Sequence, residues 1–305
     1  MKPKILIADK IHDKAIEEAK SFADVELDFN LSPKELIEGI NKYDALIVRS
    51  GTKVTRDVIW GADKLRIIGR AGVGLDNIDL EAAREKNIEV VNSPEASTIS
   101  VAELTLGAII ALMRNIHHGH STLKQGRWDR SRLAGNELYG KKLGIIGFGR
   151  IGREVADRAR AFGMDVLAFD PSITGEDARE NNCEYRGIND LIREADVLSL
   201  HVPLNEQTRN LIDAKKIAQM KKNAVIINVA RGGVVNEKDL YEALKKQTIR
   251  GAALDVFETE PPEGNPLLTL DNIILTPHLG ASTEEAQINA GTVVVEKIRN
   301  HFRTA

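Results

Sequence analysis

Four side chains that can transfer a proton or bind an anion occur in the second half of the sequence, each shortly after an apolar segment. They are Arg231, Asp255, Glu260 and His278. Histidine titrates near neutral pH, so His278 is the natural acid/base, and Glu260 can stabilise its protonated form. The guanidinium of Arg231 can bind a carboxylate through two parallel hydrogen bonds. Together these residue types indicate proton transfer on a bound anionic substrate.

Each of these residues also has an ordinary structural explanation. An aspartate at a strand end often caps a helix, a Glu-Pro-Pro sequence often forms an exposed turn, and a single histidine is often structural. The catalytic interpretation therefore depends on a cofactor motif elsewhere in the chain.

Residues 141–170 contain such a motif. An apolar run leads into Gly147, Gly149 and Gly152, and an amphipathic segment then leads to a second apolar run that ends at Asp170. In a dinucleotide-binding turn, the first glycine makes the turn, the second admits the pyrophosphate and the third allows close helix packing. Asp170 can bind both ribose hydroxyls and would repel a 2′-phosphate, which predicts NAD rather than NADP. A plain strand–helix–strand turn without a ligand is the alternative.

Apolar segments alternate with amphipathic segments along most of the chain. The expected strands cover residues 4–8, 25–29, 45–48, 65–69 and 88–91, and then 143–146, 166–169, 197–200, 224–228, 251–254 and 272–275. This alternation predicts an α/β fold with two Rossmann-like, doubly wound parallel-sheet domains, six strands in the second. Because ligands bind at the carboxyl ends of such strands, we expect the four reactive side chains to share one edge. At that edge, Asp255 either holds the nicotinamide carboxamide or orients a loop.

The first domain is expected to be discontinuous in sequence. Ser93-Pro94 interrupts the alternation, and a final helix that starts from a capping box at Ser282 lies past the last strand. We therefore predict a flavodoxin-like substrate-binding domain of residues 1–93 plus 282–305, and an NAD-binding Rossmann domain of residues 94–281.

A helix over about residues 100–123 and the polar stretch that follows it to residue 140 are expected to form an arm. Trp128, Leu133 and Leu138 in this stretch need burial, which favours contact with a second subunit. A surface loop is the alternative.

Composition restricts the possible partners. The 305 residues carry a net charge of −3, so no general attraction to nucleic acid or to an anionic membrane is expected. A single cysteine excludes an internal disulfide, and no apolar run approaches the roughly 20 residues of a membrane helix. No secretory signal is expected at the start of the sequence, and no metal site is expected. These features predict a cytoplasmic protein.

Five segments resemble the D-2-hydroxyacid dehydrogenase family, and the likeness spans nearly the whole chain. They are RAGVGLDNID, LGIIGFGRIGREVADRARAFGMDVLAFDP, INVARGGVVNEKDLYEAL, GAALDVFETEPP and TPHLGAST. The runs HLGASTEEAQ and VRSGTKVT are similar to the members that oxidise D-3-phosphoglycerate with NAD in the first step of L-serine synthesis. Reduction of glyoxylate or hydroxypyruvate by another D-2-hydroxyacid dehydrogenase is one alternative. An NAD-sensing co-repressor built on the same fold is another.

The resemblance also implies roles for individual residues. It implies Arg231, Glu260 and His278 as catalytic residues, with His278 the proton donor and acceptor. Substrate contacts are implied for Arg49, Gly72, Val73, Gly74, Arg231 and His278. Cofactor contacts are implied for Val73, Gly147, Gly149, Arg150, Ile151, Gly152, Asp170, Val202, Val229, Ala230, Asp255, His278, Gly280 and Ala281.

Family members are dimers or larger assemblies, so the resemblance implies a homodimer or a dimer of dimers that binds a small phosphorylated 2-hydroxy acid. Arg130 or Arg132 of a partner subunit is expected to reach the substrate phosphate, beside Arg49. Longer members add C-terminal domains that bind serine. None follows Ala305 in this sequence, so we expect a short form without that feedback inhibition.

Overall fold

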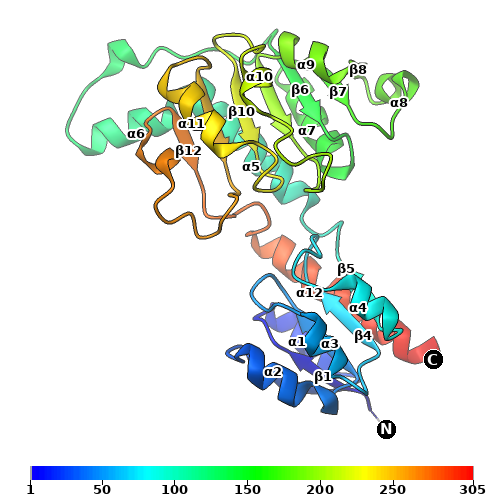
Figure 1. Cartoon of the computed structure of the whole chain (residues 1–305). Helices are drawn as coiled ribbons and strands as arrows, with labels where there is room; N and C mark the ends of the chain where they lie inside the picture. The colour runs from blue at the N-terminus through cyan, green and yellow to red at the C-terminus, as the bar shows by residue number, and fades with distance from the viewer. Residues whose placement is uncertain (1, 305) are drawn as a thin grey trace. The chain divides into compact units, whose positions relative to one another are not determined.

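A computed structural model describes residues 2–304, which fold into two compact units. Of these residues, the first unit contains 2–98 and 281–304, and the second contains Ile99–Gly280 (Figure 1). These limits lie close to the predicted boundaries at residues 93–94 and 281–282, although the first crossing falls later in the chain. Both sheets are entirely parallel, which confirms the predicted α/β class.

The first unit contains a five-stranded sheet in the order β2-β1-β3-β4-β5. Its strands are β1 (Lys4–Ile7), β2 (Asp24–Leu27), β3 (Ala45–Val48), β4 (Ile67–Arg70) and β5 (Glu89–Asn92). One face packs on α1 (Asp13–Lys20) and α12 (Glu284–Thr304). The other packs on α2 (Pro33–Gly39), α3 (Arg56–Trp60) and α4 (Leu80–Glu85), and a 3₁₀ turn, η1 (Ile40–Lys42), follows α2.

The last helix, α12, belongs to the first unit because it packs directly on β4. A Cβ atom added to Gly69 would lie 2.4 Å from Cγ1 of Val294, so only glycine permits this close approach. Lys297 on the same helix donates a hydrogen bond to the carbonyl oxygen of Asn92 at 2.7 Å. The first unit is therefore discontinuous in sequence.

The second unit contains a seven-stranded sheet in the order β12-β11-β10-β9-β6-β7-β8. Its strands are β6 (Lys142–Ile146), β7 (Asp165–Phe169), β8 (Glu184–Tyr185), β9 (Val197–Leu200), β10 (Val225–Asn228), β11 (Gly251–Leu254) and β12 (Ile273–Leu275). The prediction of six strands missed β8, which has only two residues and pairs with β7 at the sheet edge.

Alternate side chains of the second sheet enter two separate cores. One core packs against α5 (Thr98–Met113), α7 (Arg150–Ala161) and α8 (Gly175–Glu180). The opposite core packs against α9 (Ile188–Glu194), α10 (Ala214–Ile217) and α11 (Glu237–Lys245). Two short 3₁₀ turns, η2 (Arg130–Arg132) and η3 (Pro266–Thr269), complete the unit. Burial on both faces explains why these strands are continuous apolar runs.

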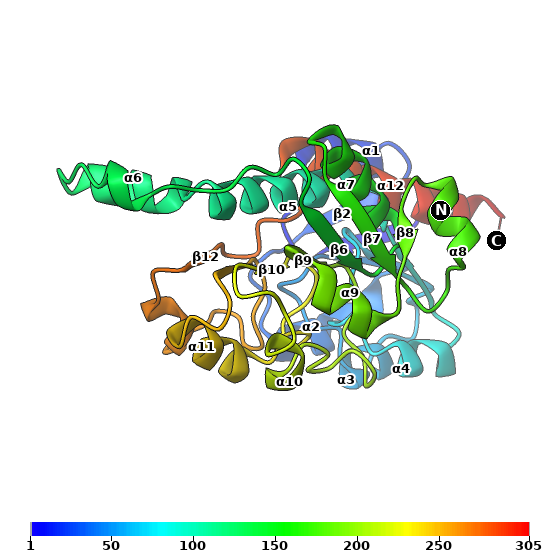
Figure 2. The ribbon, with the colours of Figure 1, turned by 90° about the horizontal axis from the view of Figure 1, so that it is seen from above.

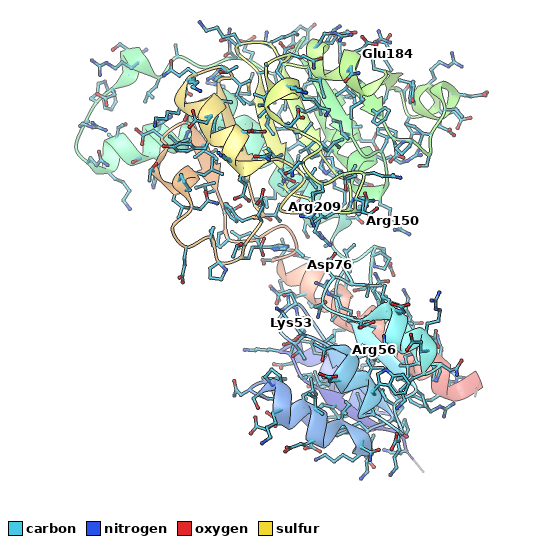
Figure 3. All side chains as sticks on the ribbon, viewed as in Figure 1. Lys53, Arg56, Asp76, Arg150, Glu184 and Arg209 are labelled. Carbon is cyan, nitrogen blue, oxygen red and sulfur yellow. The ribbon has the colours of Figure 1, made fainter. Side chains whose placement is uncertain are left out.

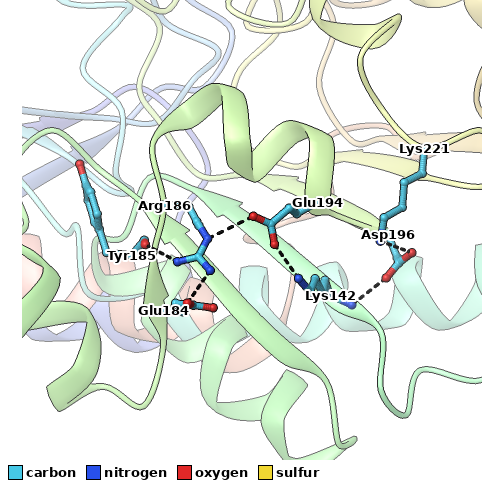
Figure 4. A network of polar contacts seen from close by, with 7 residues as sticks. All are labelled: Lys142, Glu184, Tyr185, Arg186, Glu194, Asp196 and Lys221. Atoms are coloured by element: carbon cyan, nitrogen blue, oxygen red, sulfur yellow. Dashed lines mark hydrogen bonds and ion pairs between the residues drawn. The ribbon is translucent and has the colours of Figure 1, made fainter.

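A network of charged side chains joins β8, α9 and the amino ends of β6 and β9. It contains Lys142, Glu184, Arg186, Glu194, Asp196 and Lys221 (Figure 4). Glu194 contacts Nζ of Lys142 at 2.5 Å and Nε of Arg186 at 3.2 Å, and these hydrogen bonds lower the pKa of its carboxyl group. The network lies at the opposite strand ends from the glycine turn, so it supports the scaffold and leaves the carboxyl edge free for a site.

The predicted helix over residues 100–123 is wrong as a single element. Asn115 adopts a left-handed conformation with φ of 52° and separates α5 from α6 (Ile116–Lys124). The guanidinium of Arg250 closes the end of α5, donating hydrogen bonds to the carbonyl of Met113 at 3.2 Å and to Oδ1 of Asn115 at 3.1 Å. Figure 2 shows α6 projecting away from the sheet of its own unit.

Among the residues that the structure describes, no single helix is both long and apolar enough to cross a membrane. Only α5 and α6 taken together have that length and composition, and the chain bends by 66° between them.

Replacing Arg250 with alanine should lower the free energy of unfolding by about 1–3 kcal/mol, because carbonyl groups at the end of α5 lose their donor. Urea unfolding followed by circular dichroism measures this loss. Arg179→Ala, at an exposed position of α8, is the matched control and should unfold like the wild type. Equal midpoints for the two variants would contradict the capping role of Arg250.

Candidate active site

Glycines shape the turn between β6 and α7 for reasons of space. Gly147 has φ of 95°, and a Cβ atom there would lie 2.5 Å from the carbonyl oxygen of His201. A Cβ atom on Gly152 would lie 2.3 Å from the carbonyl oxygen of Gly147. A side chain at either position would push α7 or the β9 loop away from the turn.

Gly149 differs from these two glycines, because a Cβ atom there would meet no described protein atom within 4 Å. Gly149 is the N-cap residue of α7, and its backbone begins the helix without a side-chain cap. The first amides of a helix and its dipole attract a phosphate group. Open space beside an uncapped helix end fits the pyrophosphate of a dinucleotide.

Asp170 follows β7 and turns back on the glycine turn. Its Oδ2 accepts the amide of Phe148 at 2.9 Å, and its Oδ1 accepts the amide and hydroxyl of Ser172 at 2.9 and 2.6 Å. Burial favours the protonated acid, but these hydrogen bonds outweigh it and lower the pKa of Asp170. The carboxylate is therefore charged at neutral pH and would oppose a 2′-phosphate.

Two arginines lie along the same edge of the second unit. Arg150 is the first residue of α7, and Arg209 lies in the segment after β9 (Figure 3). The guanidinium of Arg209 lies beside Gly233, where an added Cβ would be 3.7 Å from Nη1. A role was predicted for Arg150 but not for Arg209, which adds positive charge along the carboxyl edge.

The carboxylate of Asp255 organises the loop after β12. It is 2% exposed and accepts hydrogen bonds from Oγ1 of Thr276 at 2.5 Å and from the amides of Leu279 and Gly280 at 2.7 and 2.8 Å. The carbonyl oxygen of Asp255 accepts the amide of His278 at 2.9 Å. Asp255 therefore orients a loop, one of its two predicted roles, and its contact with nicotinamide stays a prediction.

His278 stands in this loop with φ of 54°, an uncommon conformation for a non-glycine residue. Its Nδ1 lies 2.8 Å from Oε2 of Glu260, and Oε1 of Glu260 accepts the amide of Phe257 at 3.1 Å. About half of the His278 side chain is exposed. When Nδ1 donates to Glu260, the Nε2 lone pair is left for an outside donor, which is the arrangement of an acid/base with an orienting carboxylate.

Arg231 lies in the loop after β10, where its Nη1 donates to the carbonyl oxygen of Ala230 at 2.7 Å. Asn228 binds this loop twice: its Oδ1 accepts the amide of Ala230 at 3.1 Å, and its Nδ2 donates to the carbonyl of Arg231 at 2.9 Å. At Gly232 an added Cβ would lie 1.8 Å from the carbonyl oxygen of Phe257. The Arg231 loop therefore packs directly on the loop that carries Glu260.

His201, at the end of β9, is not a second acid/base of this kind. Its Nε2 lies 2.8 Å from the hydroxyl of Ser199, and burial lowers the pKa of His201 to about 3. The imidazole therefore stays neutral at physiological pH and serves as a structural contact.

The other predicted cofactor residues fall in both units. Val202, Val229, Ala230 and Gly280 follow strands of the second sheet, and Ile151 lies in α7. Val73 and Ala281 belong to the first unit.

The first unit holds the remaining predicted substrate residues on two loops after β3 and β4. Arg49 donates its amide to Oδ2 of Asp9 at 2.5 Å, and its carbonyl accepts Nδ2 of Asn77 at 2.7 Å. In the loop of Gly72, Val73 and Gly74, the carbonyl of Val73 accepts Nδ2 of Asn92 at 2.6 Å. Both loops are thus held by side chains at strand ends.

The residues that hold these loops were not predicted from the sequence. They are Asp9, Asn77, Asn92 and Asn228. Three of them, Asp9, Asn92 and Asn228, stand at or just after the end of an apolar strand. A polar residue at the end of an apolar strand can form hydrogen bonds with the backbone of a neighbouring loop. That pattern in the sequence could have identified these three residues.

The chain matches the family model described as D-isomer specific 2-hydroxyacid dehydrogenase, NAD binding domain, over residues 106–280. The matched region is more than half of the chain and ends where the second unit ends. The chain therefore belongs to the D-isomer specific 2-hydroxyacid dehydrogenases, and its cofactor is NAD. This confirms the family and the cofactor that the sequence motifs indicated.

Individual members of the family are similar to this chain over most of its length. D-3-phosphoglycerate dehydrogenase of Methanocaldococcus jannaschii is 58% identical over 301 residues, covering 98% of this chain and 57% of that protein. Hydroxypyruvate reductase of Thermotoga maritima is 49% identical over 272 residues, covering 88% of each chain. The solved structure of D-lactate dehydrogenase from Aquifex aeolicus, complexed with NAD and lactic acid, matches with a TM-score of 0.88 and 30% identity, over 99% of this chain and 96% of that one.

The chain spans about half the length of the phosphoglycerate dehydrogenases that it matches. The expected short form without regulatory domains stays a prediction.

Replacing Gly149 with alanine should weaken NAD binding about tenfold or more, because the methyl group occupies space that the pyrophosphate needs. Folding stability should stay close to that of the wild type, since the methyl group meets no described protein atom. Calorimetric titration with NAD, alongside thermal unfolding, measures both effects.

Gly39→Ala is the control for this test, because a Cβ atom there also meets nothing within 4 Å of the described structure. NAD affinity in Gly149→Ala equal to that of the control would show that the dinucleotide does not pass this glycine.

Proposed function

We propose that this chain oxidises D-3-phosphoglycerate to 3-phosphohydroxypyruvate with NAD, the first step of L-serine synthesis. The observation that carries the proposal is the hydrogen bond between Nδ1 of His278 and Oε2 of Glu260, at the carboxyl edge of the NAD-binding domain. Relatives named D-3-phosphoglycerate dehydrogenase, at up to 58% identity, support the choice of substrate.

Bound NAD would accept the hydrogen on C2 of the substrate as a hydride ion. Nε2 of His278 takes the proton of the C2 hydroxyl group, because Nδ1–H is directed to Glu260. The Glu260 carboxylate stabilises the imidazolium that results, and Arg231 binds the substrate carboxylate. In the reverse direction His278 returns the proton.

The first unit supplies the substrate-binding domain in this proposal. The amides of Gly72, Val73 and Gly74 bind the substrate carboxylate, and the guanidinium of Arg49 binds the phosphate. Asp9 and Asn77 fix the backbone of Arg49 on both sides. Nη1 of Arg49 donates to the carbonyl oxygen of Lys10 at 3.4 Å, and the other donors of the guanidinium would bind the charged group. Sequence similarity and the charge of the substrate support these assignments.

Reduction of hydroxypyruvate is the second candidate. It is favoured by the hydroxypyruvate reductase of Thermotoga maritima, which this chain matches along 88% of both lengths. Hydroxypyruvate has no phosphate, so this reaction does not require Arg49. Initial rates with D-3-phosphoglycerate, D-glycerate, D-lactate and 2-hydroxyglutarate, and with hydroxypyruvate in the reverse direction, separate the two.

A homodimer or a dimer of dimers also belongs to the proposal. Apolar side chains on the arm are largely exposed within the chain, with Trp128 at 78% and Leu123 at 57%. Leu138, in contrast, is buried against the core of its own unit. A partner subunit over residues 100–140 would cover the exposed group and bring Arg130 or Arg132 to the substrate phosphate. A cytoplasmic location likewise stays a prediction.

Replacing His278 with alanine should lower kcat for D-3-phosphoglycerate about 10²- to 10⁴-fold, because the proton acceptor is removed. NAD affinity should change by less than about twofold, since the glycine turn and Asp170 are untouched. Steady-state kinetics and NAD titration check the two expectations. Lys215→Ala, at an exposed position of α10, is the control. Near-normal turnover by the His278 variant would exclude this residue as the acid/base.

Replacing Arg49 with alanine should lower kcat/KM for D-3-phosphoglycerate about 10- to 100-fold, because a charged hydrogen bond to the phosphate is lost. The value for D-glycerate should hardly change. Lys64→Ala removes the same charge from an exposed site before β4 and should affect neither substrate. An equal loss of kcat/KM for both substrates would show that Arg49 does not bind the phosphate.

A further inference from the structure

Glu237, the first residue of α11, contacts the loop that carries Glu260 at two points. Its Oε1 accepts the amide of Glu258 at 2.5 Å, and its Oε2 accepts Nδ2 of Asn265 at 2.6 Å. Oδ1 of Asn265 in turn accepts the amide of Leu267, whose side chain is completely buried. Both ends of the segment 258–265 therefore donate to the Glu237 carboxylate, and Glu260 lies within this segment.

The peptide group that Glu237 binds is next to the one that places Glu260. The amide of Phe257 donates to Oε1 of Glu260, and the carbonyl of Phe257 packs against Gly232. The amide of the following residue, Glu258, donates to Glu237. This backbone belongs to no helix or strand, so side-chain contacts fix its position.

The environment of Glu237 is unfavourable for a negative charge. Burial raises the pKa of its carboxyl group, and the charges of Glu258 and Glu260 on the facing loop add to this effect. The two hydrogen bonds from the loop act in the opposite direction. A carboxylate in such a place is suited to hold the loop through two donors rather than to attract cations from solvent.

We propose that Glu237 is a positioning residue for proton transfer, which fixes the Phe257–Glu258 peptide so that Glu260 meets Nδ1 of His278. The inference rests on the proposed function, because Glu237 acts only through Glu260 and His278. With Glu260 in place, the neutral imidazole carries its proton on Nδ1 and offers the Nε2 lone pair to the substrate hydroxyl. Without Glu237 the loop is released and the tautomer is no longer fixed.

Kinetics of Glu237→Ala and Glu237→Gln give the first part of the test. In Glu237→Ala, kcat for D-3-phosphoglycerate should fall about 10- to 100-fold, the cost of a misplaced catalytic group, while KM for NAD changes less than about twofold. Glu237→Gln keeps one acceptor oxygen and should lose less activity. Glu263→Gln removes a charge from an exposed position of the same loop and should match the wild type.

Nitrogen-15 spectra of the histidine side chains give the second part. In the wild type above neutral pH, His278 should carry its proton on Nδ1, and Glu237→Ala should show a mixture of tautomers. The His278→Asn spectrum assigns the signal. A fall in kcat with an unchanged tautomer would overturn the proposal, as would unchanged kinetics.

The tautomer also separates this proposal from the proposed function. If the wild type oxidises no D-2-hydroxy acid, the proposed function fails, and the spectra of the wild type and the Glu237 variants still decide whether Glu237 positions the pair. If circular dichroism shows that Glu237→Ala does not fold, the same comparison is made with Glu237→Gln.

Discussion

The buried carboxylate of Asp255 is the contact on which the arrangement of the site depends. It accepts a hydroxyl and two amides from the loop after β12, and its own backbone carbonyl accepts the amide of His278. A buried carboxylate without partners costs several kcal/mol, so the loop is stable only when it closes on Asp255. The left-handed conformation of His278 and its approach to Glu260 follow from that closure.

Both units use the same construction at the carboxyl ends of their strands. Asp9 and Asn92 in the first unit, and Asn228 and Asp255 in the second, each stand at or just after a strand end and bind the backbone of a neighbouring loop. The strands themselves are held by apolar packing on both faces and, at the amino ends of β6 and β9, by charged pairs. Rigid sheets with polar residues at one edge thus let loops of irregular backbone carry the reactive side chains.

Structure could be predicted from the sequence most accurately where a residue type has a single structural role. The apolar runs located both sheets, and the glycine spacing located the turn where an added Cβ at Gly147 or Gly152 would collide with backbone. The short strand β8 escaped prediction, because two residues carry no periodic signal. The break at Asn115 was also missed, since helical periodicity continues through it and the capping donor, Arg250, is distant in sequence. Loop contacts such as those of Glu237 depend on tertiary structure and leave no local pattern.

The proposed reaction removes the C2 hydrogen of D-3-phosphoglycerate as hydride while His278 takes the hydroxyl proton. The most direct test uses D-3-phosphoglycerate that carries deuterium at C2, with NAD in ordinary water, and follows the label by NMR. We expect the deuterium to appear in reduced nicotinamide, in an amount equal to the 3-phosphohydroxypyruvate formed. NAD binding in which the substrate keeps its deuterium would contradict the proposed dehydrogenase activity.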